Sequence, residues 1–541
     1  MQKTLFTILF LPSILFISPE TAFAISAEKL NLLLCDRVEQ SSAELSALEG
    51  NEASHTMQRW LADIYDKTGP PPLWVTQDGP GEKAAILFSV LKNSAIDGLA
   101  PEQYKISRIT SLWDGKSAEE LIDLDTLLTF AFVMYAHDAQ GGRDPSRKKS
   151  SIPIPTLEAT ALLEAALSSS DFSQFLADLL PPHRYYKNLR AALPSYQNMA
   201  ATGGWPTIEV GKSIHPGDED SRIPAIKKRL QIEGFLQSAT TDPTVNDEAF
   251  VQAVIRFQSR HGLAEDGVIG KLTIAAMNVP AQQKVRRIIL NLERWRWESH
   301  DLGRKYVLVN IAGFTLEAIS DDTVVLEMAV VVGTQQNKTP LFSDHIQYIE
   351  TNPFWNIPTS IARNEMLGEL RKNPRYLNSH HIRLFSDWSS DAREIDPLSL
   401  NWKQVSQKKI GQFKLRQDPG KKNALGSIKF VFPNSYDVFM HDTPAQTLFQ
   451  RSSRAFSHGC IRLEKPVDLA AFLMNNGENG WPMERFHAMI ATGKRTIIRL
   501  PEPLPVHITY QTVRSDQNGT LSFHTDIYDR DRQLEQILFT E

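Results

Sequence analysis

Hydrophobic positions recur with two different periods along this chain, and the change between them divides it. Up to about residue 200, apolar side chains recur every three or four positions. The segment 124–136 shows this with Leu127, Leu128, Ala131 and Tyr135, and segment 84–91 is similarly apolar. This spacing predicts amphipathic helices. From about residue 304 the apolar residues form β-branched or aromatic runs bounded by turns, which predict strands at 306–311, 323–332, 428–432 and 436–441.

A compact helical unit is predicted between these regions, at about 208–278. It follows the break Ala201-Thr202-Gly203-Gly204-Trp205-Pro206. We expect helices near 222–233, after a cap at Asn246, and at 271–277. The tight turn Asp266-Gly267-Val268-Ile269-Gly270 precedes the last helix and resembles the D-G-x-x-G turn of three-helix peptidoglycan-binding domains. The alternative is a spacer bundle.

A long polar stretch interrupts the predicted strands. Residues 351–420 are prone to helix and rich in Trp, Asn and Arg. An insertion this long in a β domain is usually functional, and a lid is the common case. Farther on, the runs 506–513 and 521–528 predict a β appendage.

The expected fold class is therefore multidomain α+β. It combines a helical N-terminal region, a three-helix peptidoglycan-binding module and a mainly β catalytic domain with an inserted helical cap. The expected ranges are a signal peptide at 1–24, a helical scaffold domain at 25–204, the peptidoglycan-binding domain at 205–280, a linker helix at 281–303, the catalytic domain at 304–500 with its cap at about 351–420, and the appendage at 501–541.

The N-terminus predicts export from the cytosol. Lys3 precedes a mostly apolar run at 5–17, and Ala22-Phe23-Ala24 is a small-x-small cleavage pattern. These features are typical of a secretory signal peptide cut after Ala24. The run is short for a membrane span. An uncleaved signal that anchors the protein in the inner membrane is the alternative.

Composition narrows the function classes. Of 541 residues, 42% are hydrophobic, and 58 basic against 63 acidic residues give a net charge of −5. No basic excess exists to bind a polyanion, so we expect no nucleic-acid partner. Only Cys35 and Cys460 are present, too few for a disulfide framework.

The segment Ser457-His458-Gly459-Cys460-Ile461-Arg462 carries the clearest chemistry in the chain. A cysteine nucleophile needs a base or a positive field, backbone N–H groups for an oxyanion, and space for an acyl group. Gly459 permits a sharp turn, and Arg462 supplies positive charge. His441 ends a predicted strand 19 residues before Cys460, a spacing that can bring imidazole and thiol together.

Other interpretations of these residues remain open from the residues alone. Cys460 alone fits a buried small hydrophobe. His441, His458 and Cys460 provide three donors that suit zinc. A disulfide between Cys35 and Cys460 is a third alternative in an oxidising compartment.

The two motifs together resemble those of the L,D-transpeptidases, cysteine enzymes of bacterial cell-wall cross-linking. They are Phe439-Met440-His441-Asp442-Thr443-Pro444 and Ser457-His458-Gly459-Cys460-Ile461-Arg462. The large periplasmic YcbB-type members are also similar in the order of parts and in three further segments. These are Asn291-Leu292-Glu293-Arg294-Trp295, Asn352-Pro353-Phe354-Trp355-Asn356-Ile357-Pro358 and Asn423-Ala424-Leu425-Gly426.

The resemblance implies a site. Cys460 is the implied nucleophile and His441 its base, oriented by a backbone carbonyl rather than by Asp442. Ser457, His458 and Gly459 would shape the loop and the oxyanion hole. Arg462 would position substrate or loop. The expected cap residues near the stem peptide are Trp355, Asn356, Tyr376 and Trp388.

The resemblance also implies a reaction in the periplasm, without metal or cofactor. Cysteine attacks the third residue of a tetrapeptide stem and releases D-alanine. An amine of a second stem then takes the acyl group, which cross-links third residues. The implied partners are stem peptides, glycan strands and carbapenem inhibitors. The alternatives are hydrolysis by the same cysteine and a non-catalytic wall-binding scaffold.

Overall fold

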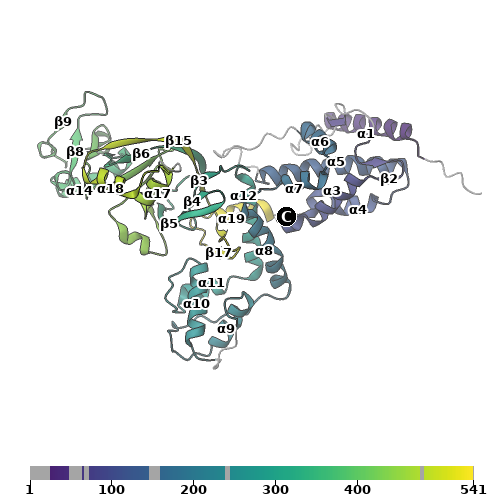
Figure 1. Ribbon diagram of the computed structural model, residues 1–541, viewed down its shortest axis with the longest axis horizontal. Coiled ribbons are helices and arrows are strands. Elements are labelled where there is room, and N and C mark those ends of the chain that lie inside the picture. Colours follow the sequence, from purple (N-terminus) through teal and green to yellow (C-terminus); the bar gives the residue numbers. More distant parts are fainter. Residues whose placement is uncertain are drawn as a thin grey trace, which may run out of the picture. The chain divides into compact units, whose positions relative to one another are not determined.

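A computed structural model describes residues 25–47, 64–65, 72–144, 159–237, 244–475 and 480–539. The expected signal peptide lies outside these residues. The chain forms two compact units (Figure 1), of which the first comprises Met1–Asn93, Ala100–Ala136 and Leu157–Ala177, and the second the rest. No helix within the described ranges is long and apolar enough to cross a membrane.

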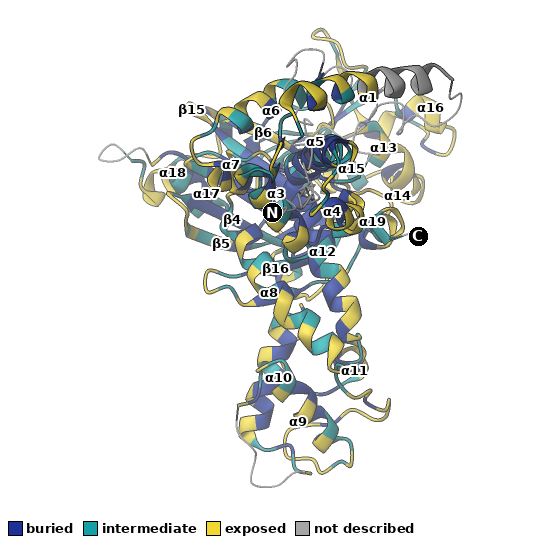
Figure 2. Ribbon diagram, turned by 90° about the vertical axis from the view of Figure 1, so that its right-hand side faces the viewer, coloured by how far each residue is buried: buried dark blue, intermediate teal, exposed yellow. Residues whose placement is uncertain are grey.

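The first unit is helical, as predicted, because its segments carry apolar residues at helical spacing. Its long helix α5 is mostly buried (Figure 2). The Asp125 carboxylate within α5 accepts hydrogen bonds from the Trp74 and Val75 amides and from the Tyr65 hydroxyl. The helices are α1 (Ala27–Ala47), α3 (Glu82–Asn93), α4 (Ile106–Leu112), α5 (Ala118–Gly141), α6 (Ala159–Ser168) and α7 (Phe172–Asp178), beside a short hairpin of β1 (Val75–Thr76) and β2 (Gly79–Pro80).

The three-helix module forms as predicted, from α9 (Ile223–Ile232), α10 (Glu248–Arg260) and α11 (Lys271–Met277). The cap of α10 is Asp247, whose side chain accepts a bond from the Phe250 amide, so the predicted cap at Asn246 is wrong by one residue. The turn before α11 requires glycine at position 267. Its φ is +69°, and a Cβ there would lie 2.8 Å from Val251.

Buried charges join this module to the next helix, α12 (Ala281–Trp297). The Glu233 carboxylate lies 2.6 Å from both the Arg229 guanidinium and the Lys284 ammonium. The Lys284 nitrogen is also 3.0 Å from Nε2 of His261. Because ions buried without partners are costly, this cluster fixes how the module meets α12.

Helix α12 also holds the segment Asn291-Leu292-Glu293-Arg294-Trp295, which proves to be structural. The Glu293 carboxylate is fully buried and accepts bonds from the Arg296 guanidinium and the Trp297 indole. The Arg294 guanidinium lies 2.6 Å from the Asp531 carboxylate near the C-terminus. The Trp295 ring stacks on Tyr185 of helix α8 (Arg184–Ala201) with centroids 5.0 Å apart.

The mainly β domain is built on a nine-stranded sheet in the order β13-β5-β14-β12-β11-β6-β15-β3-β4. Strand β4 also pairs with β5, so most of the sheet closes on itself. One face packs over the apolar core together with α17 (Pro466–Leu473) and α18 (Met483–Ala491). The strands are β3 (Lys305–Asn310), β4 (Thr315–Ser320), β5 (Thr323–Gly333), β6 (Phe342–Thr351), β11 (Ile428–Val431), β12 (Met440–His441), β13 (Ala455–Ser457), β14 (Ile461–Leu463) and β15 (Thr496–Thr509).

The predicted strand 436–441 shrinks to the two residues of β12. The side chain of Asn434 explains the difference. Its oxygen accepts bonds from the Tyr436 and Val438 amides, and its nitrogen donates to the Phe432 and Val438 carbonyls. These bonds occupy backbone groups that a longer hairpin would pair across strands.

The predicted β appendage at 501–541 is wrong at its start. Strand β15 runs through Thr509 and lies between β6 and β3, so residues 501–509 belong to the main sheet. Only the small pair β16 (Val513–Ser515) and β17 (Leu521–Phe523) follows, and then helix α19 (Arg530–Phe539). Neighbouring strands flank β15 on both sides, and the sequence pattern alone does not reveal this position inside the sheet.

The insertion has its own apolar core and a small sheet that the prediction of a helical cap did not include. Strands of two to four residues are too short to show alternation. The sheet has the order β7 (Trp355–Asn356), β10 (Lys414–Gln417), β8 (Ile382–Phe385) and β9 (Glu394–Ile395), and the helices are α13 (Thr359–Ile361), the π-helix η4 (Ala362–Met366), α14 (Leu367–Lys372), α15 (Tyr376–Ser379) and α16 (Gln407–Ile410).

Mild acid is expected to destabilise the second unit through several buried histidines, two of which are His441 and His261. Burial lowers the pKa of His441 to about 3, and burial and then Lys284 hold the pKa of His261 well below its usual range. Unfolded histidines bind protons near pH 6.5, so the unfolded state gains protons first as the pH falls. Each histidine should cost about 1.4 kcal/mol per pH unit below 6.5.

Thermal unfolding followed by circular dichroism between pH 7 and pH 5 measures this loss. His261→Phe should reduce the pH dependence by the share of one histidine, because it removes one titrating imidazole. A phenyl ring can keep the stacking on Phe257. A matched change at the exposed His345, His345→Gln, should leave it unaltered. An unfolding midpoint that is the same at pH 7 and pH 5 would contradict the expectation.

Candidate active site

Three basic side chains lie in a row on one face of the main sheet. Lys429 of β11 pairs with His441 of β12, and His441 pairs with Arg462 of β14. Residues paired in register point to the same face. Their neighbours Phe430, Met440 and Ile461 are in the apolar core, on the opposite face. Cys460 is two positions before Arg462 and so joins the basic row.

The His441 ring is held in one orientation by the backbone. Its Nδ1 donates to the Asp442 carbonyl oxygen at 2.5 Å. That bond leaves Nε2 as the acceptor nitrogen. Burial, followed by the charges of Arg462 and Lys429, lowers the pKa of His441 to about 3. The imidazole is therefore neutral at physiological pH and can accept a proton.

The Asp442 carboxylate does not orient this imidazole. Its oxygens accept bonds from the amides of Ser427 and Thr443, both at 2.7 Å. It therefore fixes the backbone that carries the Asp442 carbonyl. The expectation that a carbonyl, and not the Asp442 side chain, orients the ring agrees with this geometry.

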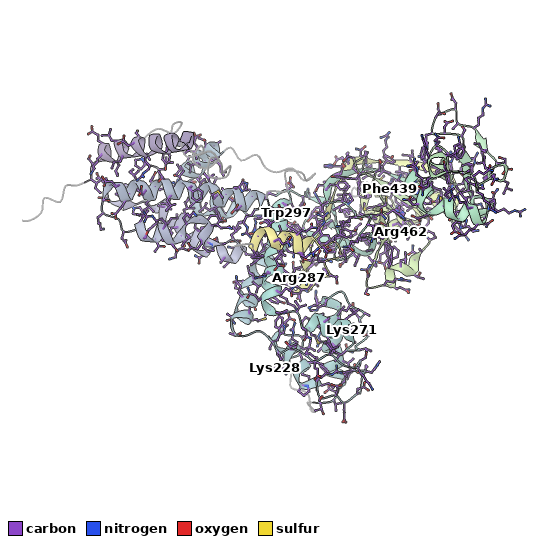
Figure 3. All side chains as sticks on the ribbon, turned by 180° about the vertical axis from the view of Figure 1, so that it is seen from behind. Lys228, Lys271, Arg287, Trp297, Phe439 and Arg462 are labelled. Carbon is purple, nitrogen blue, oxygen red and sulfur yellow. The ribbon has the colours of Figure 1, made fainter. Side chains whose placement is uncertain are left out.

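Cys460 is half-buried, and several groups act on its thiol. Burial raises the pKa of the thiol, while the Phe439 amide and the charges of Lys429 and Arg462 oppose that shift. Phe439 and Arg462 are labelled in Figure 3. The Lys429 ammonium also lies 3.9 Å from the centre of the Phe439 ring. The site is thus a desolvated thiol in a positive field.

The side-chain hydroxyl of Ser457 holds together the loop that leads to Cys460. The Ser457 hydroxyl donates to the Cys460 carbonyl at 2.5 Å and accepts a bond from the Gly459 amide at 3.1 Å. Gly459 has a φ of +114°, which L-residues rarely adopt. The Cys460 amide has no acceptor in the described part of the chain, so it is available to a ligand.

His458 points to the insertion and not to the thiol. Its Nε2 lies 2.5 Å from Oε1 of Glu365 in the π-helix η4, and both side chains are exposed. Arg462 differs, because its guanidinium has no hydrogen-bond acceptor within the described ranges and its Nε is buried. His458 therefore links the nucleophile loop to the insertion, and Arg462 is free to bind an anionic group.

The expected cap residues are spread over the insertion. Trp355 and Asn356 form β7 and pair with Gln417 and Arg416 of β10. The Tyr376 ring packs against His380 at 4.3 Å, and burial, Glu369 and Glu365 raise the pKa of its hydroxyl. Trp388 is exposed. No contact joins Trp355, Asn356 or Tyr376 to Cys460 or His441 among the described residues.

Sequence reasoning missed Lys429 and its neighbour in register, Glu350 of β6. The Glu350 carboxylate is buried and bonded to Arg495. A signal was present, because Lys429 stands between Ile428 and Phe430 in a strand whose other face is apolar. The pairing with the strand of His441 places Lys429 in the basic row, and this pairing depends on the fold.

The zinc interpretation finds no support in the geometry. In the part of the chain that the structure describes, no three His, Cys, Asp or Glu side chains gather as metal ligands. His458 is engaged by Glu365 instead. Cys35 and Cys460 are both free thiols.

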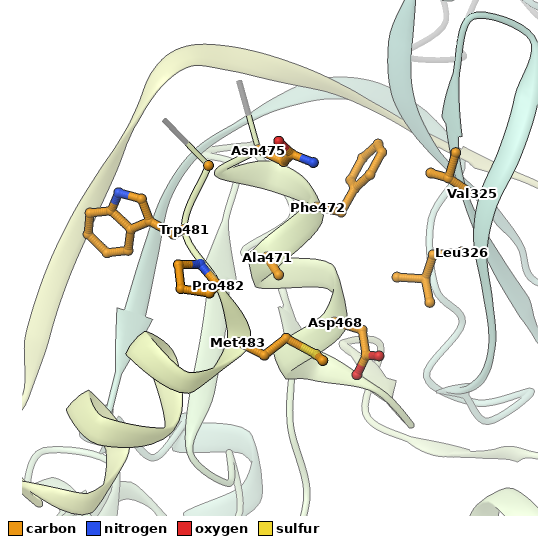
Figure 4. Close-up of a pocket in the computed structure, with 10 residues that line it drawn as sticks. Val325, Leu326, Asp468, Ala471, Phe472, Asn475, Trp481, Pro482 and Met483 are labelled. Carbon is orange, nitrogen blue, oxygen red and sulfur yellow. The ribbon is translucent and has the colours of Figure 1, made fainter. Parts of the chain in front are cut away.

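A separate open pocket of about 550 Å³ lies between β5, α17 and the segment before α18 (Figure 4). Phe472 and Asp468 of α17 face Val325 and Leu326 of β5 across it. Neither Cys460 nor His441 lines this pocket.

Three segments of the chain match models of known domain families. Residues 59–193 match a family described as "Scaffold domain", and residues 219–277 one described as "Putative peptidoglycan binding domain". Residues 304–498, which contain the basic row and Cys460, match one described as "L,D-transpeptidase catalytic domain".

A curated protein of Haemophilus influenzae, named "Putative L,D-transpeptidase", is 33% identical over 228 residues. The match covers 42% of this chain and 45% of that protein, so the chain spans under half of its relative's length.

Solved L,D-transpeptidases are also similar, at low scores. One from Xylanimonas cellulosilytica has 14% identity and a TM-score of 0.18, over 56% of this chain and 98% of its own. One from Stackebrandtia nassauensis has 15% identity and a TM-score of 0.22, over 57% and 100%. Scores this low support no structural argument. The matches to the family models are the stronger finding: residues 304–498 are similar to L,D-transpeptidase catalytic domains, and two earlier segments are similar to a scaffold domain and to a putative peptidoglycan-binding domain.

Proposed function

We propose that this protein is a peptidoglycan L,D-transpeptidase in which Cys460 is the nucleophile and His441 is the base. One observation carries the proposal. The half-buried thiol of Cys460 immediately precedes β14, and β14 pairs with β12, which carries the neutral imidazole of His441. Both strands lie inside the matched domain, and the backbone orients the imidazole. A neutral imidazole on the same sheet face as a thiol is an arrangement that cysteine acyl transfer can use.

In the proposed first step, Nε2 of His441 takes the thiol proton as the sulfur attacks the carbonyl carbon of the third stem residue. The carbon–nitrogen bond to the terminal D-alanine breaks, and the imidazolium returns its proton to the leaving amine. The product is a thioester on Cys460. In the second step the amine of another stem attacks that thioester, loses a proton to His441 and regenerates the thiol.

The charges of the row act on both partners of the proposed proton transfer, because Lys429 and Arg462 favour the Cys460 thiolate and disfavour the His441 imidazolium. Because burial lowers the pKa of His441 and raises that of Cys460, the resting pair is uncharged. Lys429 and Arg462 stabilise the thiolate as it forms. The unpaired Cys460 amide is suited to stabilise the oxyanion of the tetrahedral intermediate.

Arg462 is the proposed anchor for the donor stem. Its guanidinium has no acceptor within the described ranges and lies in the same row as His441. A planar guanidinium binds carboxylates well. Stem peptides have a carboxylate at their C-terminus and further carboxylates along the chain. Trp355, Asn356 and Tyr376 of the insertion are the proposed contacts for the rest of the stem.

The matched domains support cell-wall substrates and a site of action outside the cytoplasm. We place the protein in the periplasm, exported by the N-terminal signal peptide or anchored by it if it is not cleaved. Carbapenems are the proposed covalent inhibitors, through acylation of Cys460. Glycan strands are the proposed ligands of the module at 205–280.

Replacing the nucleophile tests the reaction directly. Purified protein incubated with tetrapeptide muropeptides should release D-alanine and form dimers joined through third residues, as read by mass spectrometry. Cys460→Ala should abolish both products, and Cys35→Ser should leave them unchanged. Tripeptide without dimers would favour hydrolysis, and unaltered cross-linking by Cys460→Ala would favour a scaffold role.

Removing the charge of Lys429 should make the thiol less reactive. Lys429→Met deletes a cation that favours the thiolate, so the pKa of Cys460 should rise further. Alkylation of Cys460 by iodoacetamide at pH 7.5 should slow by about tenfold for each unit of that rise. Lys429→Arg keeps the charge and should retain most of the rate. Equal alkylation rates for Lys429→Met and the wild type would exclude the electrostatic role.

A further inference from the structure

Buried hydroxyl groups hold the peptide bond that carries the Cys460 amide. The Thr339 hydroxyl donates to the Gly459 carbonyl oxygen at 2.8 Å and accepts a bond from the Gly333 amide at 2.9 Å. Thr339 is fully buried, in the loop between β5 and β6. Both hydrogen-bonding functions of this hydroxyl are thus satisfied, one of them by the nucleophile loop.

A tyrosine from the C-terminal segment fixes Thr339 in turn. The Tyr528 hydroxyl donates to the Gly333 carbonyl at 2.6 Å and accepts a bond from the Thr339 amide at 3.2 Å. Tyr528 is fully buried, and its own amide donates to the Tyr510 hydroxyl. Thr339 and Tyr528 therefore form a buried relay between the C-terminal segment and Gly459.

The relay orients the Cys460 N–H, which is the proposed hydrogen-bond donor to the oxyanion. The Gly459 carbonyl and the Cys460 N–H belong to one planar trans peptide, so they point in opposite directions. A bond from Thr339 that holds the carbonyl toward the interior aims the N–H away from it. The Cys460 amide indeed has no acceptor among the described residues.

The loop needs this restraint because Gly459 is conformationally permissive. Its φ of +114° is accessible to glycine, and glycine also adopts the opposite orientation readily. The Ser457 hydroxyl binds the amide of Gly459 and the carbonyl of Cys460, on either side of the peptide in question. Among the described residues, Thr339 alone forms a hydrogen bond to the peptide bond between them.

We infer that Thr339, supported by Tyr528, is a positioning residue that aims the Cys460 amide at the oxyanion. The inference rests on the proposed function and adds residues that neither motif contains. Neither hydroxyl forms a hydrogen bond to the sulfur or to His441, so we expect the relay to affect the oxyanion and not the formation of the thiolate.

Two reagents separate oxyanion stabilisation from thiol reactivity. Acylation by a carbapenem passes through a tetrahedral oxyanion, whereas alkylation by iodoacetamide is a displacement that does not. Thr339→Val keeps the shape and removes the hydroxyl, and it should slow carbapenem acylation by about 10- to 100-fold. Alkylation should stay within about twofold. Intact-mass spectrometry measures both rates.

Three further variants complete the test. Thr339→Ser restores the hydroxyl and should recover most of the acylation rate. Tyr528→Phe should slow acylation less than Thr339→Val does. Thr509→Val is the matched control, because Thr509 is a buried threonine of the same domain whose hydroxyl donates to the Val309 carbonyl, away from the loop. It should acylate at the wild-type rate.

The outcomes are distinguishable. Wild-type acylation by Thr339→Val overturns the inference, and so does a parallel fall in acylation and alkylation, which would place the effect on the thiol itself. If Thr339→Val does not fold, the Tyr528→Phe variant decides, and an unchanged acylation rate there overturns the inference. If the wild-type protein is not acylated at Cys460, the proposed function itself fails.

Discussion

The register between three short strands determines what this site can do. Pairing of β11, β12 and β14 sets Lys429, His441 and Arg462 side by side, with Cys460 at the end of the same face. A shift of one residue in β12 would turn His441 into the apolar core and Met440 toward the thiol. Apolar residues on the opposite face prevent that shift, so the packing of the core fixes the electrostatics of the site.

The scaffold around this row is held by buried ions rather than by apolar contacts alone. Glu293 and its arginine partner in α12, the Arg294–Asp531 pair and the Glu233 cluster each satisfy a charge that would be costly alone. Such pairs are specific in geometry. The segment Asn291-Leu292-Glu293-Arg294-Trp295 supplies members of two of these pairs and carries no reactive group at the site.

The sequence was informative where a signal is local. The helices, the three-helix module and the long strands followed from periodicity, and the motifs alone are the source of the prediction that Cys460 and His441 are the reactive pair. It was uninformative where partners are distant in the chain. The role of Lys429 depends on pairing with β12, the extent of β15 on burial between β6 and β3, and the loss of strand at 436–439 on the bonds of Asn434. Trp355, Asn356 and Tyr376 could be placed in the insertion but not oriented.

The placement of Tyr528 bears on the order of folding. The loop of Cys460 is supported by a side chain 68 positions later, and β15, which must insert between β6 and β3, lies between the two. A chain that folds from its N-terminus can therefore assemble the thiol and the imidazole before it can brace the peptide beside them. Contacts of such long sequence separation form late. The support that Tyr528 gives to Thr339, and through it to the Gly459 carbonyl, should accordingly be completed late in folding.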